Sequence, residues 1–101
     1  MATLTPLLFE LGQVLATPGA LAALEASGED PHFYLGRHVT GDWGKLSPVD
    51  TAANMLALAT GSQIVSSFRT SRGAKFLIAT AADRSQTYLF LPEDYPSEGA
   101  P

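Results

Sequence analysis

Residues 63–92, QIVSSFRTSRGAKFLIATAADRSQTYLFLP, decide the fold, because apolar residues recur in them with a period of two. This period is typical of β-strands, whose successive side chains point to opposite faces of a sheet. The SRG stretch at 71–73 supplies a three-residue hairpin loop, with Gly73 where a positive φ is usually needed. A second turn falls around Asp83 and Arg84. The stretch therefore predicts three consecutive antiparallel strands.

The loop chemistry and the apolar pattern agree on one strand register. Pairing Thr70 with Ala74 places Phe68 opposite Phe76, Ser66 opposite Ile78 and Ile64 opposite Thr80. A two-residue loop at the second turn then places Leu89 opposite Ile78 and Leu91 opposite Phe76. All these pairs lie on one face of the predicted sheet.

Upstream, three predicted helices begin with the same signal, a capping side chain followed by proline. The pairs are Thr17-Pro18, Asp30-Pro31 and Ser47-Pro48, and the glycines that end the helices are Gly28, Gly41 and Gly61. We expect Leu21 and Leu24 to be the buried stripe of the first helix, and Leu35 and Val39 that of the second. In the third helix the apolar residues at helical spacing predict a packed face; they are Val49, Ala52, Ala53, Leu56 and Ala59.

Residues 7–16 show a weaker alternation and predict an N-terminal strand with a soft point at Gly12. The fold class is then α+β: an N-terminal strand, three short helices, and a three-stranded antiparallel meander packed against the helices. We expect a single domain over residues 1–95 and a flexible acidic tail at 96–101.

Composition supports one folded domain. The chain has 101 residues, 46% of them hydrophobic and 16% charged, which is too apolar for intrinsic disorder. Its formal net charge of −4 argues against a large phosphate-binding surface. It has no cysteine, which excludes disulfides, thiol catalysis and zinc sites that need Cys ligands. It also lacks a long apolar run and a secretion signal, so we expect a cytoplasmic protein with no membrane contact.

The second face of the predicted meander is too apolar to remain in water. It carries Val65, Leu77, Tyr88 and Phe90, with Ala79 between them. Two explanations stay open. The N-terminal strand covers this face, or the face is an interface with a second copy or with a partner protein.

The stretch GDWG at 41–44 is the first polar candidate. The glycines suit a tight turn, and Trp43 either anchors that turn between the second and third helices or presents its ring outward to a ligand. We expect the anchoring role, with Asp42 bonded to turn amides.

The turn at Asp83 and Arg84 is the second polar candidate. Either Asp83 caps local amides while Arg84 points to solvent, or Arg84 binds a carboxylate or phosphate. A small-ligand or hydrolytic site would require Asp42 and Trp43 to meet Asp83 and Arg84 in one pocket.

A basic spot at the predicted hairpin tip is the third candidate; it consists of Arg69, Arg72 and Lys75. It is either a solvated turn or a weak contact for nucleic acid.

The usual catalytic and metal signatures are missing. His32 and His38 are six residues apart, so with Asp42 they lack the spacing of a helical metal site. The sequence contains neither a nucleophile elbow nor a phosphate-binding glycine loop. We therefore assign no catalytic residue, no metal and no cofactor, and we expect a protein that is not an enzyme.

Three stretches carry a resemblance that covers nearly the whole chain. They are LGQVLATPGALAALEASG (11–28), LGRHVTGDWGKLSPVDTAAN (35–54) and IATAADRSQTYLFLPEDY (78–95). Together they resemble small uncharacterised proteins of bacterial plasmids, phages and other mobile elements, loosely labelled plasmid-related or type I restriction subunit. Lys45, Met55 and Ala81 stand where acidic residues are usual in that group, so any site built from those acids is weakened here.

The resemblance implies a mobile-element setting but no activity. A DNA methyltransferase subunit would need a far longer cofactor-binding domain, so these residues do not support the restriction label. We predict a non-enzymatic accessory protein of a phage, plasmid or other mobile element. It would bind a host protein or itself, with inhibition of a host defence system as one form of that function and a homodimer as one form of the assembly.

Overall fold

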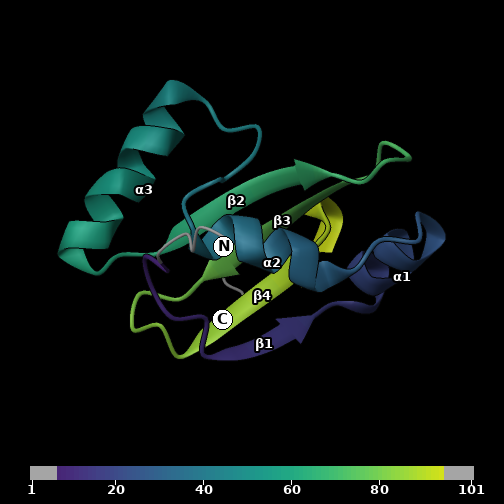
Figure 1. Cartoon of the computed structure of the whole chain (residues 1–101), viewed down its shortest axis with the longest axis horizontal. Helices are drawn as coiled ribbons and strands as arrows, with labels where there is room; N and C mark the ends of the chain where they lie inside the picture. Colours follow the sequence, from purple (N-terminus) through teal and green to yellow (C-terminus); the bar gives the residue numbers. More distant parts are fainter. Residues whose placement is uncertain (1–6, 95–101) are drawn as a thin grey trace, which may run out of the picture.

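The computed structural model describes residues 7–94 and has the predicted α+β class (Figure 1). The strands are β1 (Gln13–Ala16), β2 (Ile64–Arg69), β3 (Lys75–Thr80) and β4 (Gln86–Phe90). The helices are α1 (Pro18–Ala26), α2 (Pro31–Val39) and α3 (Pro48–Thr60), and a short 3-10 helix, η1 (Pro92–Asp94), follows β4. The tail predicted at 96–101 lies outside the described residues. Within 7–94, no helix is long and apolar enough to cross a membrane.

The four strands form one mixed sheet in the order β1-β4-β3-β2. The predicted meander is present, with Phe68 opposite Phe76 and Leu89 opposite Ile78 as expected. The sheet nevertheless has four strands and not three, because β1 pairs in parallel with β4. A parallel pair joins segments that are far apart in the chain, so local sequence patterns do not reveal it.

β1 is much shorter than the strand predicted for residues 7–16. Gly12 has a φ of +65°, and a Cβ atom there would lie 2.3 Å from the carbonyl oxygen of Ser85. The backbone therefore bends at Gly12 where it packs against the β3–β4 turn. The next amide, that of Gln13, donates to the same Ser85 carbonyl at 2.9 Å and begins the strand.

All three helix starts are confirmed. The side chains of Thr17, Asp30 and Ser47 each accept a hydrogen bond from an amide in the first turn, and proline follows each cap. Gly61 ends α3 in the left-handed conformation, with a φ of +75°. These signals are local, so the sequence was sufficient to predict them.

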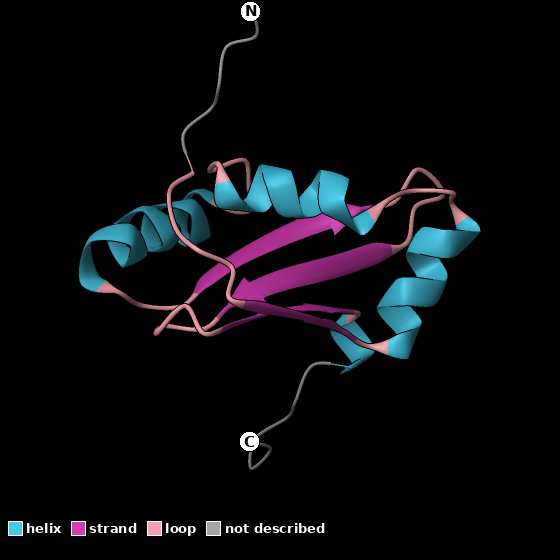
Figure 2. Ribbon diagram, turned by 60° about the horizontal axis from the view of Figure 1, so that its bottom comes forward, coloured by secondary structure: helices cyan, strands magenta, loops and turns pink. Residues whose placement is uncertain are grey.

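α1 and α2 pack on the same face of the sheet, and α2 runs over the strands in Figure 2. The core between them consists of Ala20, Leu24, Tyr34, Leu35, Phe68, Phe76, Ile78 and Leu89. Leu24, Leu35 and Val39 are buried as predicted. Leu21 is exposed, against expectation, and the smaller Ala20 faces the core instead. A small side chain there lets α1 approach the sheet closely.

α3 lies beside the outer edge of β2 and not over the sheet (Figure 1). The Asn54 amide nitrogen donates to the Val65 carbonyl at 2.7 Å, and its oxygen accepts from the Val65 amide at 3.1 Å. Two residues further along β2, the backbone amide of Ser67 donates to the Trp43 carbonyl, and the Ser67 carbonyl accepts from the Lys45 amide. These bonds satisfy backbone groups that an edge strand would otherwise offer to another chain.

The apolar stripe predicted to pack under α3 faces solvent, so this expectation was wrong. Asn54 and Ala57 are the buried residues of the helix, and the stripe lies on the opposite side. We define the outer face of α3 as Val49, Ala52, Ala53, Met55, Leu56 and Ala59, all of them exposed. Val49 is 77% exposed, Leu56 64% and Met55 58%. The bidentate pairing of Asn54 with the strand edge sets this orientation, which helical periodicity alone does not reveal.

The second face of the sheet is covered unevenly. Val65 and Leu77 are half-buried, Phe90 is buried, and Tyr88 is 40% exposed. With Lys75 and Pro92, the first three line a hollow of about 350 Å³. The N-terminal strand does not cover this face, because β1 lies within the sheet.

Replacing Asn54 by alanine should destabilise the protein by about 2 kcal/mol, because both backbone groups of Val65 lose their partner at a half-buried edge. Urea unfolding followed by far-UV circular dichroism measures the loss. The matched control is Thr51→Ala, an exposed position of the same helix. If the two variants lose equal stability, the Asn54 side chain does not anchor α3.

Candidate functional site

The GDWG stretch is a structural corner, as predicted for Trp43. The indole is buried between α2, α3 and β2, packed with Ala57 and Ile64, and its Nε1–H donates to the His38 carbonyl at 3.0 Å. Gly44 has a φ of +74°, and a Cβ atom there would lie 2.1 Å from the Ser67 carbonyl oxygen. Glycine is therefore required where the corner pairs with the edge of β2.

Beneath this corner lies a chain of buried polar groups that the sequence did not predict. His38 is fully buried and contacts the Ser66 hydroxyl through Nδ1 and the Thr80 hydroxyl through Nε2, the latter at 2.8 Å. Thr80 contacts Thr87 at 2.8 Å, and Thr87 donates to the Leu11 carbonyl at 2.7 Å. The chain joins α2, three strands and the segment before β1.

The direction of the hydrogen bonds fixes the state of the imidazole. Since Thr87 uses its proton on a carbonyl, Thr80 donates to Thr87 and must accept from Nε2–H of His38. Nδ1 then accepts from Ser66. Burial, reinforced by the positive charge of Arg84, lowers the His38 pKa from 6.5 to about 4. The ring is neutral at pH 7, and full burial prevents it from acting on a substrate.

Asp42 belongs to a second network at the surface. Its carboxylate accepts from Nε and Nη2 of Arg37 at 2.8 and 3.1 Å, and more weakly from the Gly44 amide at 3.4 Å. The hydrogen bonds from Arg37 lower the pKa of Asp42. Arg37 in turn lies over the Phe68 ring at 4.6 Å. Asp42 thus bonds a turn amide, as expected, and in addition holds a cation in place.

The β3–β4 turn holds a third network. Asp83 accepts from the Ser85 amide and hydroxyl, as predicted, and these bonds lower its pKa. Arg84 has a φ of +62° and is half-buried. Its guanidinium donates to the carbonyls of Ser62, Ala81 and Ala57, which ties the turn to the end of α3. The alternative in which Arg84 points to solvent was therefore wrong.

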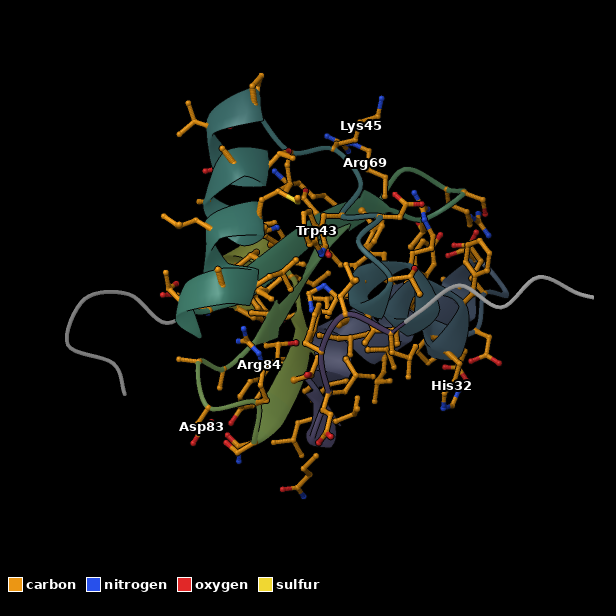
Figure 3. All side chains as sticks on the ribbon, turned by 60° about the vertical axis from the view of Figure 1, so that its left-hand side comes forward. His32, Trp43, Lys45, Arg69, Asp83 and Arg84 are labelled. Atoms are coloured by element: carbon orange, nitrogen blue, oxygen red, sulfur yellow. The ribbon has the colours of Figure 1, made fainter. Side chains whose placement is uncertain are left out.

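The polar candidates thus fall into separate networks. Trp43 is in the core, Asp42 pairs with Arg37, and Arg84 caps backbone carbonyls. Figure 3 shows Asp83 and Arg84 toward one end of the sheet, with Lys45 and Arg69 toward the other. This geometry lends no support to a ligand or hydrolytic pocket that combines Asp42 with Arg84.

Two of the three residues in the predicted basic spot donate hydrogen bonds to backbone carbonyls. Arg72 donates to the Ala26 carbonyl at 3.2 Å, and Arg69 donates to the Gly73 carbonyl at 2.9 Å. Arg69 also lines a surface hollow together with Arg37 and Lys45.

His32 is exposed beside Asp30, as Figure 3 shows for its side chain at the surface, whereas His38 is fully buried. Among residues 7–94, no three or more His, Asp or Glu side chains gather as a metal site would require.

The chain matches no protein-family model, no curated protein and no solved structure. The geometry alone must therefore indicate the function. The outer face of α3 is one feature that internal packing leaves unexplained, and it carries three exposed large apolar side chains, Val49, Met55 and Leu56. The sequence did carry a signal for this face. Asn54 interrupts a helix of small and apolar residues. Because a buried side-chain amide needs hydrogen-bond partners, Asn54 favours packing that side of the helix against the polar backbone groups of another segment.

Proposed function

We propose that this chain is a non-enzymatic protein-binding module, and that the outer face of α3 is its docking surface. A continuous apolar face in water is unfavourable by about 25 cal/mol for each Å² that a partner could cover. On a domain whose other helices are packed, such a face marks an interaction site. The observation that carries the proposal is the exposure of Val49, Met55 and Leu56 on one side of a helix anchored by the opposite side.

The occupant that best fits this face is a second copy of α3. In an antiparallel pair centred on residue 54, Val49 of one helix meets Ala59 of the other, and Ala52 meets Leu56. Large residues then face small ones at every contact, as interdigitating helices require. Asp50 is the single charged residue of α3, and the pairing places it near the partner's C-terminal turn, away from its own copy. The pattern is therefore complementary to itself.

The resemblance to proteins of plasmids and phages supplies the setting that we propose. A self-associating accessory protein without a catalytic centre would act by holding another protein, and a host defence protein is the partner class to test first. The net negative charge of this chain suits targets with basic nucleic-acid-binding grooves, since complementary charge speeds encounter and selects partners.

Sedimentation equilibrium tests the docking surface. Because one 13-residue helix buries less than a standard interface, we expect a dimer with a Kd on the order of 100 µM. Leu56→Glu should be monomeric, since it places charge at the centre of the interface. Thr51→Glu, exposed on the flank of the same helix, should dimerise like the parent chain.

Two results would overturn the assignment. A parent chain that remains monomeric into the millimolar range removes the second copy as occupant. If that monomer instead binds a purified host protein that Leu56→Glu no longer binds, the face belongs to a different partner. If Leu56→Glu and Thr51→Glu behave alike in both assays, the outer face of α3 is not a docking surface.

A further inference from the structure

A hollow of about 360 Å³ opens beside the edge of β2, where the GDWG corner pairs with that strand. We name it the edge hollow; it is lined by Arg37, Asp42, Gly44, Lys45, Ser67, Phe68 and Arg69. We propose that the edge hollow binds a terminal phosphate monoester. This inference is independent of the role proposed for α3, which lies outside the lining.

The edge hollow concentrates positive charge. Three of the six basic residues in a chain of net charge −4 line this one hollow. Within the described structure, Asp42 neutralises Arg37, whereas Lys45 and Arg69 have no acidic partner. Three cations and one carboxylate leave two positive charges. A phosphate monoester carries close to two negative charges at neutral pH, so the charges match.

One cation of the edge hollow is held in a fixed orientation. Asp42 holds the guanidinium of Arg37 at two points, and the Phe68 ring lies 4.6 Å from its centre. That cation keeps its orientation before any ligand arrives. The backbone of Lys45 is held at the edge hollow by its amide, which donates to the Ser67 carbonyl at 2.8 Å. Because the Arg37 guanidinium is already fixed, less entropy is lost when an anion binds beside it.

The same features select against two related ligands. A carboxylate brings one negative charge and leaves half of the site charge unmatched. A nucleic-acid backbone presents a run of single charges, and it needs a long basic track that this acidic chain lacks. A single terminal phosphate uses the hollow without such a track.

NMR titration of the ¹⁵N-labelled protein with phenyl phosphate, at neutral pH and constant ionic strength, tests the proposal. We expect saturable amide shifts centred on residues 44–45 and 67–69. Lys45→Gln should weaken binding at least about tenfold, because it removes a charge-assisted contact. Arg72→Gln removes a positive charge outside the lining and should change the affinity less than about twofold.

Two comparison ligands decide which class of anion the edge hollow binds. Benzoate and a short oligonucleotide without a terminal phosphate should each bind at least about tenfold more weakly than phenyl phosphate. Benzoate that binds as tightly would make the edge hollow a carboxylate site, and an oligonucleotide that binds more tightly would make it a nucleic-acid contact. Shifts that do not saturate, or equal losses in Lys45→Gln and Arg72→Gln, would refute a specific anion site.

Discussion

Replacing Trp43 by alanine should lower the free energy of unfolding by about 3 to 5 kcal/mol. The indole fills the space between α2, α3 and β2, where it packs with Ala57 and Ile64. Its removal opens a cavity and also leaves the buried His38 carbonyl without the Nε1–H donor. The cavity and the lost hydrogen bond both destabilise the folded state.

Urea unfolding measures this loss, and far-UV circular dichroism is the suitable probe because Trp43 is the sole tryptophan of the chain. Trp43→Phe keeps an aromatic ring but not the donor, so its loss should fall between those of the parent and the alanine variant. Phe33→Ala, at an exposed aromatic position, should cost less than about 1 kcal/mol. A Trp43→Ala variant that is no less stable than Phe33→Ala would show that the corner does not depend on the indole.

The protein should lose about 3 kcal/mol of stability when the pH falls from 6.5 to 4, because His38 is buried neutral. In the unfolded chain its pKa is 6.5, and in the fold burial and Arg84 lower it to about 4. Above pH 6.5 both states hold a neutral ring and the stability is complete. Between the two values only the unfolded chain gains a proton, so acid favours unfolding by about 1.4 kcal/mol per pH unit. Below pH 4 this group contributes no further loss.

Urea unfolding at a series of pH values tests this dependence. The carboxyl groups of Asp42 and Asp83 have lowered pKa values, so their contributions to stability are lost below pH 3.8. This loss lies outside the range from pH 6.5 to about 4 in which His38 acts. His38→Gln should flatten the slope between pH 6.5 and 4, whereas the exposed His32→Gln should keep it. If the imidazole of His38 is protonated at pH 5.5 in an NMR titration of the folded protein, the prediction fails.

The two histidines illustrate how far the candidate site could be anticipated. Their spacing predicted that they lie on different sides of a helix, and the structure places His32 in solvent and His38 in the core. The spacing could not show that His38 is buried at the end of a chain of hydroxyls, because Ser66, Thr80 and Thr87 lie on three different strands. Each is an ordinary strand residue in the sequence, and only the strand order brings them together.

Charged residues show the same limit at the surface. Arg69 was predicted to share a basic spot with Arg72 and Lys75 at the hairpin tip. It does lie opposite Lys75 next to that loop, and in addition it lines the edge hollow with Arg37 and Lys45, because the GDWG corner pairs with β2. That pairing depends on Gly44, whose backbone lies too close to the Ser67 carbonyl to admit a Cβ atom. Only the tertiary structure shows this contact.

The sequence by itself determined where each helix begins and which residues face each other across the meander. Caps, prolines, turn glycines and strand alternation act over a few residues, so these features do not require the rest of the molecule. The tertiary structure alone decided that β1 joins β4 and that α3 turns its apolar face outward. Both follow from how distant segments satisfy backbone groups at the sheet edges, and an amphipathic pattern shows that a helix has an apolar face but not what that face meets.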